Sequence, residues 1–221
     1  MTTEVFKFLS ELVQNNNRQW FEAHKEQYQK AKNEADSFFH KVYDAVADVD
    51  TVGAIKIYRI YRDLRFSKDK TPYKDHFGLY IGRKQPHNRG AYYLHLSPEQ
   101  VFVAGGFYGP EKDDLYRIRK ELELEGEAFF KILNSKPIQQ YFGGELAGEE
   151  LKSAPKGFAK DDPMVAYIRK KQFYLMRSFA VEDALSDRFF SEVVDSFKAM
   201  RPFFEFMTTA LTTNLNGEPI L

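Results

Sequence analysis

Cysteine is absent from this sequence of 221 residues, and tryptophan occurs only once. The absence of cysteine excludes disulfide bonds, thiolate nucleophiles and cysteine-built zinc or iron–sulfur sites, and it fits a reducing compartment. Long hydrophobic runs are also lacking: the longest stretch without a charged residue, 206–217, spans 12 positions and is half polar. That stretch is too short to cross a bilayer, and the N-terminal residues lack the basic leader of a secretory signal. We therefore expect a cytoplasmic protein that makes no membrane contact.

A net charge is lacking too, because 32 basic and 32 acidic residues cancel. This balance disfavours nucleic-acid binding, since no overall positive field attracts a polyanion. Glycine and proline are few, at 13 and 9, whereas 43% of the residues are hydrophobic and 16% are aromatic, which is typical of a packed globular protein. No internal repeat or linker-like tract divides the sequence, so we predict a single domain over residues 1–221.

The order of the hydrophobic patterns predicts an α+β fold. Residues 1–50 are predicted to be helical, with a long amphipathic helix running on from Phe21 after a break at the asparagine cluster 15–17. Residues 55–108 contain short aromatic and β-branched runs, FGLYIG, AYYLHL and QVFVAG, separated by turn residues. Residues 110–215 are predicted to be helical, beginning with Pro110 at the first position of a helix. We therefore predict an antiparallel meander covered by N-terminal and C-terminal helices.

Positive charge is concentrated in the stretch RIYRDLRFSKDKTPYKDHFG, residues 59–78. From Lys56 to His76, seven basic side chains stand against three acidic ones. We predict an extended strand over residues 58–67, which places Arg62 on its apolar face, where a guanidinium must be paired or lie at the end of the sheet. A helix is the alternative, because the apolar residues also fit a helical period. Residues 67–72 are predicted to form a turn.

This basic segment is interpreted as an anion-binding site that needs no metal and no cofactor. Arginine offers two planar donors to a phosphate or carboxylate, lysine offers a point charge, and a hydroxyl adds a neutral donor. In this interpretation Asp63 orients an arginine and Tyr73 flanks the ligand. The predicted ligand-binding residues are Arg59, Arg62, Asp63, Arg65, Ser67, Lys68, Lys70, Tyr73 and Lys74. The alternative is a solvated basic face that prevents edge-to-edge pairing of strands.

A family resemblance rests on the same segment. The stretch RDLRFSKDKTPYK resembles the signature of the family catalogued as domain of unknown function 2461. The stretches NNNRQWFEAHKEQY, AGGFYGP and LKSAPKGF are similar to other landmarks of that family, in the same order along nearly the whole chain. The resemblance implies a single intact domain of bacterial type. It implies no established activity and transfers no catalytic residue.

The glycine-rich stretch 105–109 and the histidines lead to two further predictions. The stretch GGFYG at 105–109 matches neither the dinucleotide nor the Walker spacing, so we expect it to form a bend or a close backbone approach. The five histidines are scattered, and none has a metal-ligand spacing. His76 and His95 are the candidates for a general base, with Asp63 or Asp75 as the orienting carboxylate.

Three hypotheses of function follow. The first is a binding module or metal-independent enzyme for a small molecule that carries phosphate or carboxylate. The second is a protein–protein adaptor whose basic face docks an acidic partner. The third, which the neutral total charge weakens, is nucleic-acid binding. A small ligand requires a concave pocket, an adaptor requires a flat basic face, and nucleic-acid affinity falls steeply as salt rises.

Overall fold

The computed structural model of the protein describes residues 2–65, 68–214 and 216–221. Its centre is one antiparallel sheet in which the strand order follows the chain order, so each strand pairs with the strand before it. The strands are β1 Val52–Ile57, β2 Phe77–Arg83, β3 Ala91–Leu96, β4 Val101–Phe107 and β5 Phe173–Phe179. The predicted α+β class and antiparallel meander are confirmed. The prediction that residues 110–215 are all helical was wrong, because β5 lies within them and joins the sheet beside β4.

The helices fall into three groups along the chain. Before the sheet come α1 Thr3–Gln14, α2 Arg18–Ala23 and α3 Lys25–Ala47. Between β4 and β5 come α4 Lys112–Leu124, α5 Gly126–Leu133, α6 Lys136–Phe142 and α7 Val165–Ile168, and after β5 come α8 Val181–Ala184, α9 Phe189–Ala199 and α10 Arg201–Thr212. The asparagine cluster ends α1 as predicted, and the Asn17 side chain caps α2 by accepting a hydrogen bond from the Trp20 backbone N–H at 2.9 Å. The predicted single long helix is instead interrupted at His24, which separates α2 from α3.

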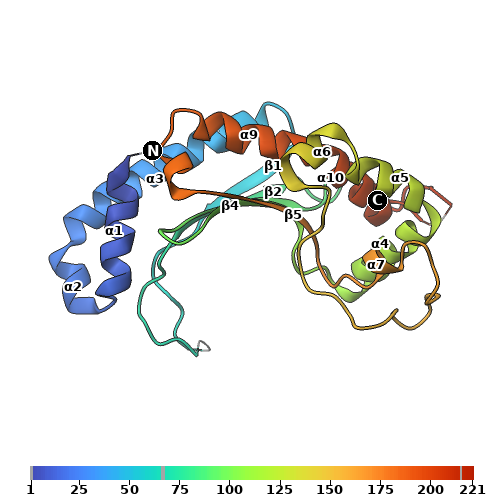
Figure 1. Cartoon of the computed structure of the whole chain (residues 1–221), viewed down its shortest axis with the longest axis horizontal. Helices are drawn as coiled ribbons and strands as arrows, with labels where there is room; N and C mark the ends of the chain where they lie inside the picture. The colour runs from blue at the N-terminus through green and yellow to red at the C-terminus, as the bar shows by residue number, and fades with distance from the viewer. Residues whose placement is uncertain (1, 66–67, 215) are drawn as a thin grey trace.

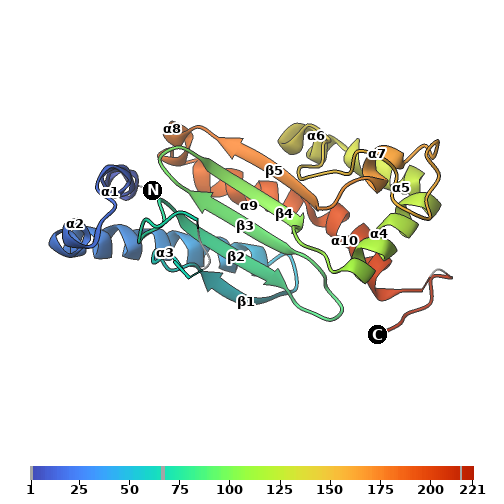
Figure 2. The ribbon, with the colours of Figure 1, turned by 90° about the horizontal axis from the view of Figure 1, so that it is seen from below.

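The helices cover one face of the sheet and leave the other open. In Figure 1 the helices α3, α9 and α10 lie above the sheet, and the opposite face looks downward between the loop 58–76 at one end and α4 and α7 at the other. Figure 2, seen from below, shows the strands in front with these three helices behind them. Within the described residues, no helix combines the length and the apolar character needed to cross a membrane.

The two faces follow from the alternation of side chains along each strand. Residues such as Leu79, Leu94 and Val103 are fully buried and point into the core beneath the helices. The residues between them in sequence, such as Tyr80 and Tyr93, face the open side. Burial of the first set holds the helical layer to the sheet, since each fully buried Leu or Val side chain stabilises the fold by about 1.5 to 3 kcal/mol.

The stretch 105–109 makes the close approach expected from its glycines. Gly106 has φ +144, and a Cβ atom there would lie 2.2 Å from the Phe173 carbonyl oxygen and 2.6 Å from the Tyr174 Cα. Only glycine lets β4 and β5 pair this closely at that point. The next helix, α4, begins at Lys112 with Glu111 as its N-cap, so Pro110 precedes the helix rather than occupying its first position.

A buried charge network joins the sheet to α10. Arg83 is 3% exposed and forms a two-point pair with Asp50, with N–O distances of 2.7 and 3.0 Å. The same guanidinium donates to Glu205 at 2.6 Å and to the Thr208 hydroxyl at 3.1 Å. The Tyr92 hydroxyl donates to Asp50 at 2.5 Å, so the polar groups of this network are paired. Burial by itself would raise the pKa of Asp50, but the hydrogen bonds from Arg83 and Tyr92 lower it.

Candidate ligand-binding site

The described residues of the predicted strand, 58–65, lie in a loop rather than in a strand or its helical alternative. Between β1 and β2, Tyr61 makes an isolated bridge with Tyr73, and the backbone of Lys74 donates to Ile60 at 2.7 Å. Phe66 and Ser67, the last residues of the predicted strand, lie outside the described residues, and so the prediction for Ser67 has no structural counterpart. The strand prediction was wrong, because the described residues 58–65 make an isolated bridge rather than a strand ladder, and the Tyr73 ring stacks on Phe21 of α2.

The Tyr73 ring lies in the core. It is 3% exposed and stacks on Phe21 of α2 with ring centroids 4.0 Å apart and planes 13° apart. The Asn16 side chain holds the Tyr73 backbone at both its N–H (3.1 Å) and its carbonyl oxygen (3.0 Å). The prediction that Tyr73 flanks a ligand was therefore wrong. Its ring anchors the loop to the N-terminal helices.

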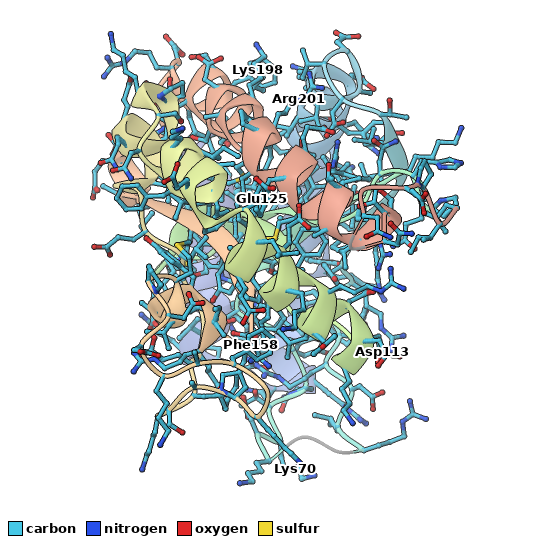
Figure 3. The ribbon with its side chains drawn as sticks, turned by 90° about the vertical axis from the view of Figure 1, so that its right-hand side faces the viewer. Lys70, Asp113, Glu125, Phe158, Lys198 and Arg201 are labelled. Atoms are coloured by element: carbon cyan, nitrogen blue, oxygen red, sulfur yellow. The ribbon has the colours of Figure 1, made fainter. Side chains whose placement is uncertain are left out.

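Most charges of the loop stabilise the loop itself. Arg65 forms a two-point pair with Asp63 at 3.0 and 2.7 Å, and this pair lowers the pKa of the Asp63 carboxyl. Lys70 donates to the Leu64 carbonyl at 3.0 Å, and Lys68 is exposed. Arg62 is half-buried and pairs with Asp69 at 3.1 Å, which confirms the expectation that its guanidinium needs a partner. Figure 3 shows Lys70 at the lower extremity of the molecule, on the side of the sheet left open by the helices.

A hollow of about 940 Å³ lies over the open face of the sheet. Of the predicted ligand-binding residues that the structure describes, Lys74 alone lines it. Tyr58 and His76, at the two ends of this loop, also line the hollow, and the rest of the described loop lies outside the lining. The sequence therefore located one end of this hollow, and the aromatic remainder of the lining was missed.

The lining is rich in aromatic rings over a floor of small residues. Register pairs Tyr80 with Tyr93, and Tyr93 with Ala104. Two residues before Tyr93 and on the same face, Ala91 pairs with Gly106. The aromatic lining residues are Tyr58, Tyr80, Tyr93, Phe102, Phe107, Tyr108 and Tyr174. Small side chains between rings leave room for a flat group to lie against the sheet.

Positive charge gathers at the loop end of the hollow. The Lys74 and Lys56 ammonium groups lie 5.1 and 4.9 Å from the centroid of the Tyr58 ring. Burial lowers the pKa of Lys74, and the nearby Arg59, Arg62 and Lys56 lower it further. Because like charges crowd this ammonium group, an anion bound beside it relieves their repulsion.

The two candidate histidines meet at the same end. His76 lines the hollow, and its Nδ1 lies 2.8 Å from the Asp75 carboxylate. Asp75 is thus the orienting carboxylate, whereas Asp63 is paired with Arg65. The His95 ring lies 4.2 Å from the His76 ring and stacks on Phe102 at 4.7 Å.

Burial keeps the groups behind His76 neutral. Burial and, to a smaller extent, the neighbouring His76 lower the pKa of His95 to about 4. The Tyr93 hydroxyl lies 3.1 Å from the His95 Nδ1, and burial raises the pKa of Tyr93 to about 12. The His95 imidazole and the Tyr93 phenol, on the β3 side of His76, are therefore both neutral at pH 7.

The opposite end of the hollow is mixed in charge. Arg89, from the loop between β2 and β3, forms an ion pair with Asp114 of α4. Tyr108 and Tyr174 lie beside each other there, with ring centroids 5.7 Å apart. These residues were not predicted, because no sequence spacing connects the β2–β3 loop, α4 and β5. In residues 2–65, 68–214 and 216–221, no group of three His, Asp or Glu side chains is arranged to hold a metal ion.

Comparison with known proteins places the chain in a family. The model of the family described as "Conserved hypothetical protein (DUF2461)" matches residues 4–206. The chain belongs to this family. The resemblance seen in the sequence motifs is thereby confirmed. No curated protein and no solved structure matches the chain significantly. In this DUF2461 protein the hollow itself is therefore the feature that points to a function.

Proposed function

We propose that this DUF2461 protein binds a small anionic molecule in the hollow over the open face of its sheet. The observation that supports this proposal is the position of Lys74, the residue at which the basic loop reaches the hollow. The bound anion lies beside the Lys74 ammonium group, and the apolar part of the ligand lies among the tyrosine and phenylalanine rings.

The chemistry of the lining supports a ligand that carries both an anion and an apolar or ring-shaped portion. Ligand pockets typically have volumes of about 300 to 1,000 Å³, with mainly apolar and aromatic walls and few polar groups. The hollow, at about 940 Å³, belongs to this class. Rings such as that of Tyr80, which is 36% exposed, offer a surface for stacking.

The adaptor hypothesis remains as a second proposal, carried by the exposed tip of the basic loop. Lys68 and Lys70 project there, outside the hollow. An acidic partner protein would dock on this tip and leave the hollow empty. A cytoplasmic location and a bacterial origin stay predictions.

Thermal unfolding with added anions separates these proposals. Phosphate, pyrophosphate, phenyl phosphate and acetate are titrated at matched ionic strength into the wild type, Lys74→Met and, as a control from the same loop, Lys68→Ala. A ligand at one hundred times its Kd stabilises the native state by about 2.7 kcal/mol. We expect stabilisation of the wild type and of Lys68→Ala and its loss in Lys74→Met, because methionine keeps the side-chain stem but removes the charge.

Two outcomes would contradict an anion site at Lys74. Stabilisation that survives in Lys74→Met but disappears in Lys68→Ala would move the anion site to the loop tip. Failure of every anion to stabilise the wild type would reject the small-anion proposal and favour an acidic protein partner.

A further inference from the structure

We propose that Lys74 and His76 form a single subsite for a phosphoryl group, and that His76 takes up a proton when a phosphoryl dianion binds. The inference rests on the proposed function and deepens it, because it names the charged group of the ligand. It also names the side chain whose charge changes on binding.

The first support is the placement of three consecutive residues. Lys74 and His76 both line the hollow, and Asp75 between them holds the imidazole from behind at 2.8 Å. The backbone N–H of Lys74 is fixed to Ile60 at 2.7 Å, and His76 immediately precedes β2. The loop and the sheet therefore present two donors to the same end of the hollow.

The second support is the orientation of the imidazole. A carboxylate 2.8 Å from Nδ1 favours the tautomer that carries its hydrogen on Nδ1, which leaves Nε2 as the atom that gains or loses a proton. Within the described residues, Nε2 of His76 has no hydrogen-bond partner. The carboxylate behind the ring also stabilises the imidazolium once it forms.

The third support is the number of charges. A carboxylate carries one negative charge, whereas a phosphate monoester carries nearly two at pH 7, because its second ionisation lies near pH 6. Among the residues that line this end of the hollow, the Lys74 ammonium group and a protonated His76 together supply two positive charges. Histidine is the side chain that changes charge between about pH 5 and 8, so it can supply the second charge when the dianion arrives.

The groups around His76 allow one added proton. The charged and titratable groups that face it are Asp75 on its own segment, Lys74 at the rim, and His95 with Tyr93 from β3. Arg62 acts on the site through Asp75, whose pKa it helps to lower. His95 and Tyr93 are half-buried and neutral, so the incoming proton resides on His76. It comes from solvent, and no bond in the ligand is broken.

Titration calorimetry with phenyl phosphate tests the inference on the full chain. Measurements at pH 7.5 in two buffers of different ionisation enthalpy give the number of protons taken up per ligand bound. We expect a positive uptake, below one proton, and an affinity that decreases as the pH rises from 6.5 to 8.5. His76→Gln should abolish the uptake and weaken binding at pH 6.5 by about tenfold, while His87→Gln, in the exposed β2–β3 loop, should behave as the wild type.

Asp75→Asn provides a second variant that keeps the imidazole. It should reduce the uptake, because the imidazolium loses its carboxylate partner. Thermal unfolding of each variant without ligand checks that it folds.

The outcomes distinguish this inference from the proposed function. If phenyl phosphate binds and Lys74→Met abolishes binding, but His76→Gln changes neither affinity nor proton uptake, the inference is overturned and the anion site stands. If benzoate binds as tightly as phenyl phosphate with the same uptake, the phosphoryl assignment is overturned. If phenyl phosphate does not bind the wild type at any pH, both proposals fail together.

Discussion

On the open face of the sheet, the surroundings of each titratable side chain determine whether it can carry a charge. His95 is flanked by Phe102 and His76 and contacts the Tyr93 hydroxyl, so its ring has little access to water. Charging an imidazole there costs free energy because water is replaced by rings and a second histidine. Protonation of His95 therefore destabilises the folded protein.

The stability of the fold should decrease with falling pH through His95. The pKa of His95 is 6.5 in the unfolded reference and about 4 in the folded protein, so the unfolded chain binds more protons between these values. The contribution of His95 is therefore fully present above pH 6.5 and is lost as the pH falls toward 4. At pH 5 the loss amounts to about 2 kcal/mol.

His95→Phe tests this linkage, because phenylalanine keeps a ring against Phe102 but cannot be protonated. Urea unfolding at pH 7 and pH 5 should show a smaller loss of unfolding free energy in the variant than in the wild type. Equal losses in the two proteins would contradict a role for His95, since acid effects on the other carboxylates and histidines are common to both.

The buried pair of Asp50 and Arg83 gives a second prediction at the residue scale. Asp50→Asn should lower the free energy of unfolding by about 3 kcal/mol, because it leaves the buried guanidinium without its main counter-charge. The matched control is Glu205→Gln, which removes the half-exposed partner of the same guanidinium and should cost about 1 kcal/mol or less. Urea unfolding of both variants measures the difference, and equal costs would show that the buried pair is not the stronger one.

Residue-level prediction from the sequence succeeded where charge and spacing carried the signal. Asp75 beside His76 was among the expected carboxylate–histidine pairs, and the structure joins them. Tyr73 was misjudged, because a tyrosine between basic residues has the same appearance in sequence whether its ring faces a ligand or stacks on Phe21. That choice depends on α2, which is distant in the sequence.

At the scale of elements, pairing across the sheet depends on a few permissive positions. Gly106→Ala should lower the free energy of unfolding on the order of 2 to 3 kcal/mol, because its Cβ would collide with the backbone of β5 and its φ of +144 disfavours a side chain. Thermal unfolding measures the effect. Gly109→Ala is the control, since a Cβ there meets no atom within 4 Å; an equal loss in both variants would contradict the argument from close approach.

The sequence predicted β2, β3 and β4 well but missed β5. The three predicted strands are short runs bounded by turn residues, and that local signal agrees with their tertiary pairing. The β5 segment, FYLMRSF, contains leucine, methionine and arginine, which are good helix formers, and it lies between segments that form helices. Its pairing with β4 is a long-range contact and overrides the local preference.

For the whole molecule, the sequence indicated a sheet with helices on it but not which face they leave open. Alternation in AYYLHL separates Tyr92 and Leu94 from Tyr93 and His95, yet both sets contain aromatic rings. The first set is buried beneath α9 and α10, where Tyr92 packs on Phe197 and Phe204. Only the three-dimensional course of the C-terminal helices shows that the second set lies on the open face, where Tyr93 lines the hollow.

The size of the hollow gives a prediction at the same scale. Ala104→Leu places a larger side chain on the floor of the hollow. We expect binding of phenyl phosphate to weaken by about tenfold, because the leucine occupies the space for the phenyl ring. Binding of inorganic phosphate at the Lys74 end should be unaffected. Ser178→Leu is the matched control, because Ser178 lies in β5 on the same face of the sheet but does not line the hollow. Calorimetry with both ligands tests this. Equal weakening of the two ligands by Ala104→Leu would mean that it disturbs the anion site rather than the ring site.

The pairing of each strand with its predecessor has a consequence for how the family can vary. The longest excursion between neighbouring strands, residues 108–172, leaves the sheet after β4 and returns to it at β5. The entropy cost of closing such a loop grows only slowly, by about 0.6 kcal/mol for each doubling of its length. This excursion carries α4 and Asp114 to one end of the hollow, so lengthening or shortening it would remodel that end while the sheet and the Lys74 end keep their geometry. If the hollow binds a ligand as we propose, a change in the length of this excursion would alter one end of the site without changing the sheet or the Lys74 end.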